Sequence, residues 1–363
     1  MALTTVQGQM LTAPLTLTGN LTFSDGSVQT AAASPYVLKN RIINGAMQIW
    51  QRGTSFASTA GYTTDRWSTI GYGSYNETVS QSTSVPTTAG NAFQYSLKLQ
   101  RPASSTGTIP VLIGQAIESV NCYDLSSQTV TLSFWARAGA NYSSSGSTLT
   151  TQLVTGTTAD QGITSYATWA GYASPISNAS TILTTSWQKF SYTATLGSGI
   201  LEAAIIFYFT PSGTAGADDS AYITGVQLEV GSTATPFERR LYNQELANCQ
   251  RYFEMSFEIG TAPSNGGAST FSTNNGLAQC VAMNGSYGGG WIPWKVTKRA
   301  TPTVTTYGNS SGYWGWATNS GALTFSTSTI SGTASQNGYT VSQQVSNNAF
   351  ALISGHYTVS AEL

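Results

Sequence analysis

The chain has 363 residues with 14 basic and 15 acidic side chains, so its formal net charge is -1. Charged residues make up 8% of it, against about 25% in an average globular protein, which gives no indication of a nucleic-acid or anionic-lipid surface. The length exceeds that of a typical single hydrophobic core and predicts two or more folding units. A surface of hydroxyls, amides and glycine favours neutral partners, such as sugars or further copies of the same chain.

The chain carries no recognisable export or membrane signal. Its first 12 residues lack the positive and apolar regions of a secretory leader, and the longest apolar run, 203–209, is too short to cross a bilayer. We therefore expect synthesis in a cytoplasm without general export. Cys122, Cys249 and Cys280 are widely separated and odd in number, so we interpret them as buried thiols rather than a disulfide framework or zinc site.

Residues 1–38 contain one charged side chain, Asp25. Apolar residues alternate with threonine in "LTLTGNLTF", and an Asp-Gly pair at Asp25 and Gly26 follows, which predicts a β-hairpin. A segment this short cannot bury a core by itself. We expect it to be an attachment segment that pairs with a neighbouring chain or structure.

Residues 39–234 consist of short runs of alternating polarity separated by turn residues. Val130, Leu132 and Phe134 alternate with polar residues, which is typical of a strand with one buried face. About eight such runs favour a large antiparallel sandwich of jelly-roll type. The clearest are 93–100, 129–139, 150–156, 187–196, 203–209 and 221–230.

Residues 235–256 break the β pattern and predict a linking helix. Thr235, Pro236 and Glu238 match a capping box with proline at the first helical position. Downstream apolar residues are spaced as one stripe of a short helix, which would be marginal in isolation and must pack on something. We expect three copies to meet along this stripe as a neck; the alternative is that each helix lies against its own sandwich. The stripe is Tyr242, Leu246, Cys249 and Phe253.

Residues 257–363 return to strand patterns, with loops richer in tryptophan than those before them. We interpret them as a second, smaller β-sandwich at the tip. The predicted fold class is mainly β: an N-terminal attachment segment, a large jelly roll, a short linking helix and this sandwich.

Catalytic chemistry has little support in the sequence. His356 is the only histidine and lies in an alternating terminal strand, so we expect it to be structural or on the surface. No acidic pair stands in an obvious apolar pocket; Asp218 and Asp219 are expected in a solvated turn, with a calcium site as the alternative. The glycine-rich stretches do not match a phosphate-binding loop. We predict no enzyme, no metal and no cofactor.

Two stretches rich in glycine and aromatic residues give the strongest binding signal. Exposed aromatic rings stack on the C–H faces of sugar rings, while nearby Asn and Ser bond to hydroxyl groups. The alternative is that the rings fill an interface between protomers or cap a small core. The candidates for carbohydrate binding are Tyr287, Trp291, Trp294, Tyr313, Trp314 and Trp316.

Other aromatic residues rank below these. Tyr166, Trp169 and Tyr172 form a weaker candidate of the same kind in the larger domain. Trp67 and Trp135 sit at strand-like positions, and we assign them to the core.

Three stretches carry a resemblance to a known class of proteins: "NRIINGAMQIWQRGTSF" (40–56), "DRW" (65–67) and "VQLEVGSTATPFERRLYNQELANCQRYFE" (226–254). They resemble a recurrent module of tailed-bacteriophage tail fibres and tail-tip proteins, which is similar to jelly-roll carbohydrate-binding modules. The stretch at 20–32 resembles short β elements near the attached ends of phage fibres. "NGAM" at 44–47 lacks the acidic residue of the module's calcium site, so none is carried over.

The resemblance implies a virion component, usually a homotrimer, that carries β domains to a receptor on the host surface. We predict a non-enzymatic tail-fibre or tail-tip protein that binds host surface glycans for phage adsorption. Residues 1–38 would contact other tail or baseplate proteins, and the protein would act outside the host cell after assembly in its cytoplasm. The alternatives are a purely structural virion protein and, less favoured, a polysaccharide depolymerase.

Overall fold

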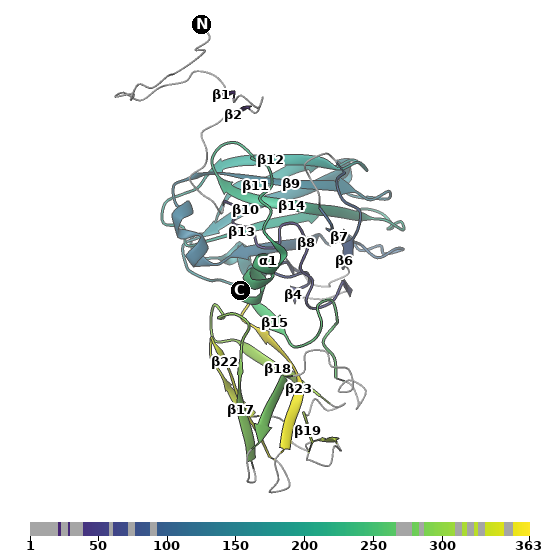
Figure 1. Cartoon of the computed structure of the whole chain (residues 1–363). Helices are drawn as coiled ribbons and strands as arrows, with labels where there is room; N and C mark the ends of the chain where they lie inside the picture. Colours follow the sequence, from purple (N-terminus) through teal and green to yellow (C-terminus); the bar gives the residue numbers. More distant parts are fainter. Residues whose placement is uncertain are drawn as a thin grey trace, which may run out of the picture. The chain divides into compact units, whose positions relative to one another are not determined.

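The computed structural model describes residues 21–22, 28–29, 39–57, 61–71, 77–87, 93–265, 278–282, 287–308, 314–317, 323–325, 331–344 and 351–363. Residues 1–39 and 40–363 are separate compact units. In the first, strands β1 (Leu21–Thr22) and β2 (Val28–Gln29) pair antiparallel, as the hairpin prediction requires (Figure 1). The Asp-Gly pair expected in its turn lies outside the described residues.

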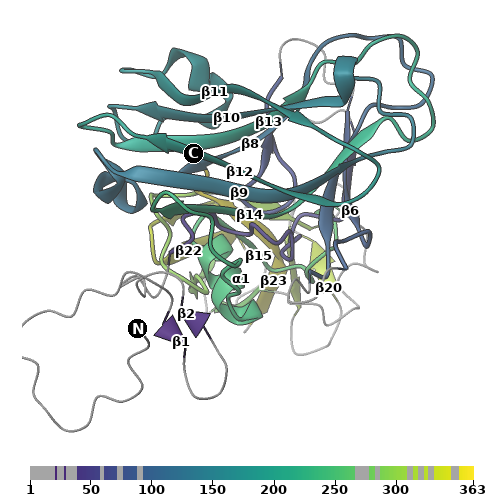
Figure 2. The same ribbon diagram turned by 90° about the horizontal axis from the view of Figure 1, so that it is seen from above.

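The second unit begins with a sandwich of two six-stranded antiparallel sheets, seen as two layers in Figure 2. One sheet has the order β11-β10-β13-β8-β5-β4 and the other β12-β9-β14-β7-β6-β3. The strands of the first sheet are β4 (Gly61–Tyr62), β5 (Ser68–Thr69), β8 (Val111–Ile117), β10 (Thr148–Gly156), β11 (Ala173–Ile182) and β13 (Glu202–Phe209). Those of the second are β3 (Ser55–Ala57), β6 (Thr78–Ser82), β7 (Ser96–Gln100), β9 (Thr129–Ala138), β12 (Gln188–Thr195) and β14 (Ser220–Val230).

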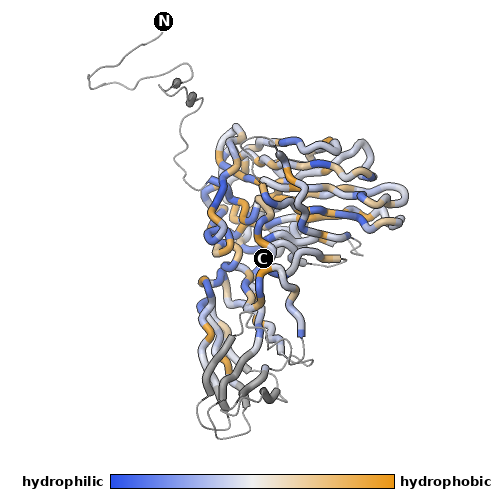
Figure 3. The backbone as a smooth tube through the Cα atoms, turned by 45° about the vertical axis from the view of Figure 1, so that its right-hand side comes forward, coloured by the Kyte–Doolittle hydropathy of each residue, from blue (hydrophilic) through white to orange (hydrophobic). Residues whose placement is uncertain are grey.

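The main core lies between these sheets. Phe134 of β9 meets Phe207 of β13 edge to face, with ring centroids 4.8 Å apart. Trp67 is buried against Phe207, and Trp135 is also buried, so both core assignments are confirmed. Figure 3 shows apolar positions scattered along the strands between polar ones, the alternation expected where one strand face is buried.

A further apolar layer covers the outer face of the first sheet. The 3-10 segment η4 (Ile163–Thr168) lies there, and Tyr166 and Trp169 pack with Ile206 of β13. Tyr166 and Trp169 are therefore core residues, and their prediction as weaker sugar-binding candidates is wrong. Tyr172 is 41% exposed, so for this residue sugar binding stays a prediction. The other short 3-10 segments are η1 (Ser119–Asn121), η2 (Tyr123–Leu125) and η3 (Ser145–Ser147).

The linking helix is shorter than predicted and has a different start. Helix α1 spans Tyr242–Gln250 and has no side-chain cap. The Thr235 hydroxyl donates to Glu229 Oε2 at 2.6 Å, and the Glu238 N–H donates to Gln227 Oε1 at 2.8 Å. The capping-box prediction is wrong because side chains of β14 engage both groups and hold the segment 231–241 in a non-helical path.

The smaller sandwich begins at Phe253, inside the range predicted as helix. One sheet comprises β15 (Phe253–Met255), β16 (Ala278–Ala282), β18 (Thr303–Tyr307), β19 (Gly315–Ala317), β20 (Leu323–Phe325) and β23 (Ala351–Ser360). The other has the order β17-β22-β21, with β17 (Tyr287–Pro293), β22 (Gly338–Gln344) and β21 (Ser331–Ala334). Antiparallel sandwiches with one short α-helix among the described residues confirm the predicted fold class.

Candidate functional site

Two of the predicted sugar-contacting tryptophans belong to the core of the smaller sandwich. The Trp314 side chain is fully buried, and its indole N–H donates to the His356 carbonyl at 3.1 Å. Trp294 is buried against Tyr339, with its indole N–H donating to the Ser335 carbonyl at 2.8 Å. Neither ring offers a face to a ligand, so the prediction is wrong for these two residues.

Trp291 is different, because its side chain is 51% exposed. Its glycine-rich stretch forms strand β17 rather than a loop, and strand alternation turns Ile292 inward and Trp291 outward. On β22, Thr340 faces Trp291 across the strand pair, and Thr333 of β21 faces Thr340. Both threonines are exposed, so the indole has hydroxyl groups beside it on an open sheet face.

A glycine on the neighbouring strand sets the position of this indole. A Cβ atom built on Gly338 would lie 2.3 Å from Trp291 Cζ2, so the ring of Trp291 lies against the bare Gly338 backbone. We call the surface formed by Trp291, Gly338, Thr340 and Thr333 the indole platform. An aromatic ring that is fixed by packing, half exposed and flanked by hydroxyl groups can stack on the face of a sugar ring.

Three candidates remain predictions. Tyr287 and Trp316 lie on strands β17 and β19, but the described part of the structure does not include their side chains. Tyr313 lies outside the described residues.

The helix stripe does not form a continuous outward seam. Tyr242 is 47% exposed and Leu246 is half-buried, but Cys249 is fully buried. Phe253 lies on β15, where the Arg52 guanidinium sits 3.5 Å from its ring centroid. The neck prediction is therefore wrong for Cys249 and Phe253, because each already packs within its own chain. The number of copies in the assembly stays a prediction.

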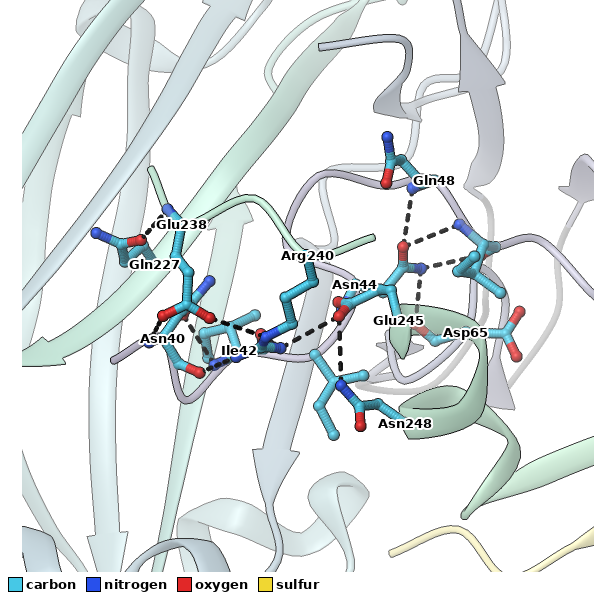
Figure 4. A network of polar contacts seen from close by, with 12 residues as sticks. Asn40, Ile42, Asn44, Gln48, Asp65, Gln227, Glu238, Arg240, Glu245 and Asn248 are labelled. Atoms are coloured by element: carbon cyan, nitrogen blue, oxygen red, sulfur yellow. Dashed lines mark hydrogen bonds and ion pairs between the residues drawn. The ribbon is translucent and has the colours of Figure 1, made fainter. Parts of the chain in front are cut away.

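The three stretches that carry the resemblance meet in one polar framework, shown in Figure 4. Asn44 is its centre: the side-chain NH2 donates to the carbonyls of Ile49 and Asp65, and Oδ1 accepts the N–H of Gln48 and Ile49. The backbone N–H of Asn44 donates to Glu245 of α1. A Cβ on the following Gly45 would lie 2.1 Å from the Val226 carbonyl oxygen, so this turn requires glycine.

Arg240 joins the framework to the segment after β14. Its Nε donates to Glu238 Oε1 at 3.0 Å, and Nη1 donates to Glu245 Oε2 at 3.2 Å and to the Ile42 carbonyl at 3.2 Å (Figure 4). Nη2 donates to the Asn40 carbonyl. One guanidinium thus forms ion pairs with two carboxylates and fixes the loop at 40–44 against helix α1.

A pocket opens beside this framework. Its empty volume, including the solvent-filled mouth, is about 380 Å³. Phe93 and Phe237 form an edge-to-face pair in its wall, with ring centroids 5.2 Å apart. The lining residues are Asn40, Asn44, Ala46, Gln48, Phe93, Phe237, Glu238, Arg239, Arg240 and Glu245.

Charged side chains also tie the last residues of the chain to the large sandwich. Glu362 accepts from Arg66 and, at 2.8 Å, from Arg52. The Arg66 guanidinium lies over the Tyr252 ring, 3.6 Å from its centroid. Beside them, burial raises the pKa of Asp65 to about 6 despite the nearby Arg52 charge. Much of the scarce charge of this protein is therefore used inside the molecule.

The acidic pair and the histidine have structural roles. Asp219 is fully buried and pairs with Arg101 at 2.8 Å, whereas Asp218 pairs with Lys98 at 2.9 Å. The solvated-turn prediction is wrong for Asp219, because the buried guanidinium compensates its charge. His356 is buried and stacks on Phe257, with ring centroids 4.1 Å apart.

The cysteines, the possible metal ligands and the helices are the subjects of further predictions. Cys122 and Cys249 are free and buried, as predicted, and Cys280 lies on β16 without a described side chain. Within the described ranges, no group of three or more His, Cys, Asp or Glu side chains is arranged to hold a metal ion. None of the helices described is long and apolar enough to cross a membrane.

No protein family matches the sequence, and no curated protein matches it. Among solved structures, the enzymatically active domain of tailspike protein 4 of bacteriophage CBA120 is similar, with 17% identity and a TM-score of 0.36 over 55% of this chain and 22% of that one. A family 4 carbohydrate-binding module shows 17% identity and a TM-score of 0.32, over 52% of this chain and 98% of the module. A family 61 carbohydrate-binding module in complex with β-1,4-galactotriose shows 12% identity and a TM-score of 0.31, over 53% of this chain and 100% of the module.

Proposed function

We propose that this chain is a non-enzymatic tail-fibre or tail-tip protein of a bacteriophage, and that it binds host cell-surface glycans during adsorption. The observation that carries glycan binding is the indole platform, where Trp291 is 51% exposed and lies against Gly338 beside two exposed threonines. The low charge of the chain agrees with a neutral ligand.

The virion assignment rests on the sequence resemblance. The residues that carry it serve a structural purpose here: Asn44, Glu238 and Glu245 fix the start of the large sandwich against helix α1. In this proposal residues 1–38 attach the chain to other tail proteins, and the assembled homotrimer supplies several weak sites whose combined avidity holds the host.

The proposal is tested by applying the purified full chain to an array of bacterial surface glycans and, in parallel, to host cells before phage is added. We expect binding to a restricted set of glycans and a reduced rate of phage adsorption. An array with no signal above background, together with adsorption unaffected by excess protein, would reject glycan recognition.

A structural virion role is the second candidate, and the contacts of Glu362 favour it. Because Glu362 bonds to Arg52 and Arg66 of the large sandwich, the two sandwiches are tied together as a rigid spacer would require. Imaging of labelled protein in the virion separates the two roles. A position within the fibre shaft, with Trp291 covered by other chains, would favour the structural role.

A further inference from the structure

We propose a second sugar-binding site, for a single neutral sugar unit, in the pocket of the large sandwich between Phe93, Phe237 and the Arg240 framework. This site is distinct from the indole platform: it lies on the segments 40–48 and 237–245, whereas Trp291 lies on β17. None of the aromatic residues predicted to bind sugar lines this pocket.

The wall of the pocket suits the apolar face of a sugar ring. Phe93 and Phe237 meet edge to face at 67° and are both half-buried, so part of each ring remains accessible. Gly225 has φ 62°, and a Cβ there would lie 2.6 Å from Phe93 Cζ. The irregular register of β14 at this glycine thus makes room for the Phe93 ring. Aromatic surfaces held in this way bind the C–H face of a pyranose.

The floor of the pocket suits hydroxyl groups. Glu245 accepts hydrogen bonds from Asn44, Arg240 and Asn248, whereas a carboxylate offers about four acceptor positions, so it has capacity for one more donor. The Gln48 side-chain amide forms no hydrogen bond with the described residues and offers both a donor and an acceptor. The Glu245 carboxylate is held in place before any ligand arrives, which lowers the entropic cost of binding.

Charge and size narrow the class of ligand. Glu238 and Glu245 are balanced by Arg239 and Arg240 among the lining residues, so neither an anionic nor a cationic ligand gains net attraction. The empty volume of about 380 Å³ counts the open mouth as well, so the enclosed part of the pocket is considerably smaller. One neutral hexose or N-acetylhexosamine unit fits this description better than a long chain.

The experiment is a titration of the full chain with a panel of neutral monosaccharides and with a hexuronate. Binding is measured by NMR or calorimetry. Ala46→Trp fills the pocket from its lining without removing any group of the framework. Ala103→Trp, at an exposed alanine outside the pocket, is the matched control for an added indole. Trp291→Ala removes the indole platform and leaves the pocket unchanged.

We expect at least one neutral sugar to bind wild type and Ala103→Trp alike. Trp291→Ala loses binding at the indole platform and keeps saturable binding in the pocket. Ala46→Trp lowers the affinity of the pocket at least about tenfold, as does replacing the neutral sugar by a hexuronate. Unchanged binding in Ala46→Trp would overturn the second site, as would the absence of saturable binding in wild type. If Trp291→Ala alone abolished binding, the pocket would be excluded while the proposed function at the indole platform would stand. Circular dichroism of each variant confirms that its fold is intact.

Discussion

At the scale of single residues, two glycines position the aromatic rings to which we assign binding. Gly338 and Gly225 each leave a space that a neighbouring ring occupies, and neither space is visible in the sequence, because it depends on how adjacent strands align. Trp291 could be predicted as a binding residue because it lies in a stretch rich in glycine and aromatic residues. Trp294, three positions further on, could not be separated from it, because only strand alternation turns one ring outward and the other inward.

Gly338→Ala tests this packing directly. The added methyl would lie 2.3 Å from Trp291 Cζ2, so the indole must move away from the sheet. We expect a red-shifted tryptophan emission and weaker glycan binding, by roughly 1 kcal/mol as a typical aromatic contribution. Gly197→Ala is the control, since nothing lies within 4 Å of its added Cβ. Unchanged emission and binding would show that Gly338 does not position the ring.

Glu202 gives a prediction about pH. Burial raises its pKa to about 7 from an ordinary value of 4.5, although Oε2 accepts the Gln161 N–H at 2.7 Å. The folded state therefore holds this proton more tightly than the unfolded chain, and stability is lost as pH rises from about 4.5 through about 7. Glu202→Gln should raise the free energy of unfolding by about 1–3 kcal/mol at pH 8 and change it little at pH 4.5.

Urea denaturation of Glu202→Gln and wild type at several pH values measures this difference. Because Asp65 also has a raised pKa, only the difference between the two proteins isolates Glu202. A stability difference that does not change between pH 4.5 and pH 8 would contradict a buried, proton-retaining carboxyl group.

At the scale of elements, most strands of the large sandwich could be predicted because their alternation is local. Strand β9, predicted as 129–139, spans Thr129–Ala138. The helix start could not be predicted, since Thr235 and Glu238 do have the residue types of a capping box. The competing partners, Gln227 and Glu229, are close to them only after β14 has formed. Strand β8 is not among the clearest predicted runs: both of its faces are buried, so its residues do not alternate between apolar and polar.

Glu245 is the side chain through which helix α1 is held, so Glu245→Ala should destabilise the protein by about 2–4 kcal/mol. The change removes the acceptor of the Asn44 N–H and leaves Arg240 with one carboxylate fewer. Gln244→Ala, on the exposed side of the same helix, is the control and should be nearly neutral. Equal urea midpoints for the two variants would show that the framework does not anchor the helix.

At the scale of the whole molecule, charge is scarce and concentrated where segments distant in sequence meet. Glu362 lies 296 positions after Arg66, yet the two form a buried ion pair. The sequence predicts separate domains joined by a helix and gives no sign of this contact, because long-range pairing leaves no local pattern. Residues 40–363 accordingly form one compact unit.

Glu362→Ala tests whether this contact unites the two sandwiches. Removing the carboxylate leaves the buried Arg66 without its acidic partner, a change that typically costs about 3–5 kcal/mol. We expect one calorimetric transition in wild type and two in the variant, with Glu258→Ala, at an exposed position, behaving as wild type. A single transition at the wild-type temperature in Glu362→Ala would rule out this coupling.

The proposed function depends above all on recognition of a host glycan through Trp291. The most direct measurement is the affinity of the full chain for purified host surface polysaccharide, compared between wild type, Trp291→Ala and the control Trp187→Ala, which removes a half-buried indole from the large sandwich. We predict binding by wild type and Trp187→Ala, and affinity at least about tenfold lower for Trp291→Ala. Equal affinity of all three proteins, or no binding by wild type, would contradict glycan recognition through Trp291.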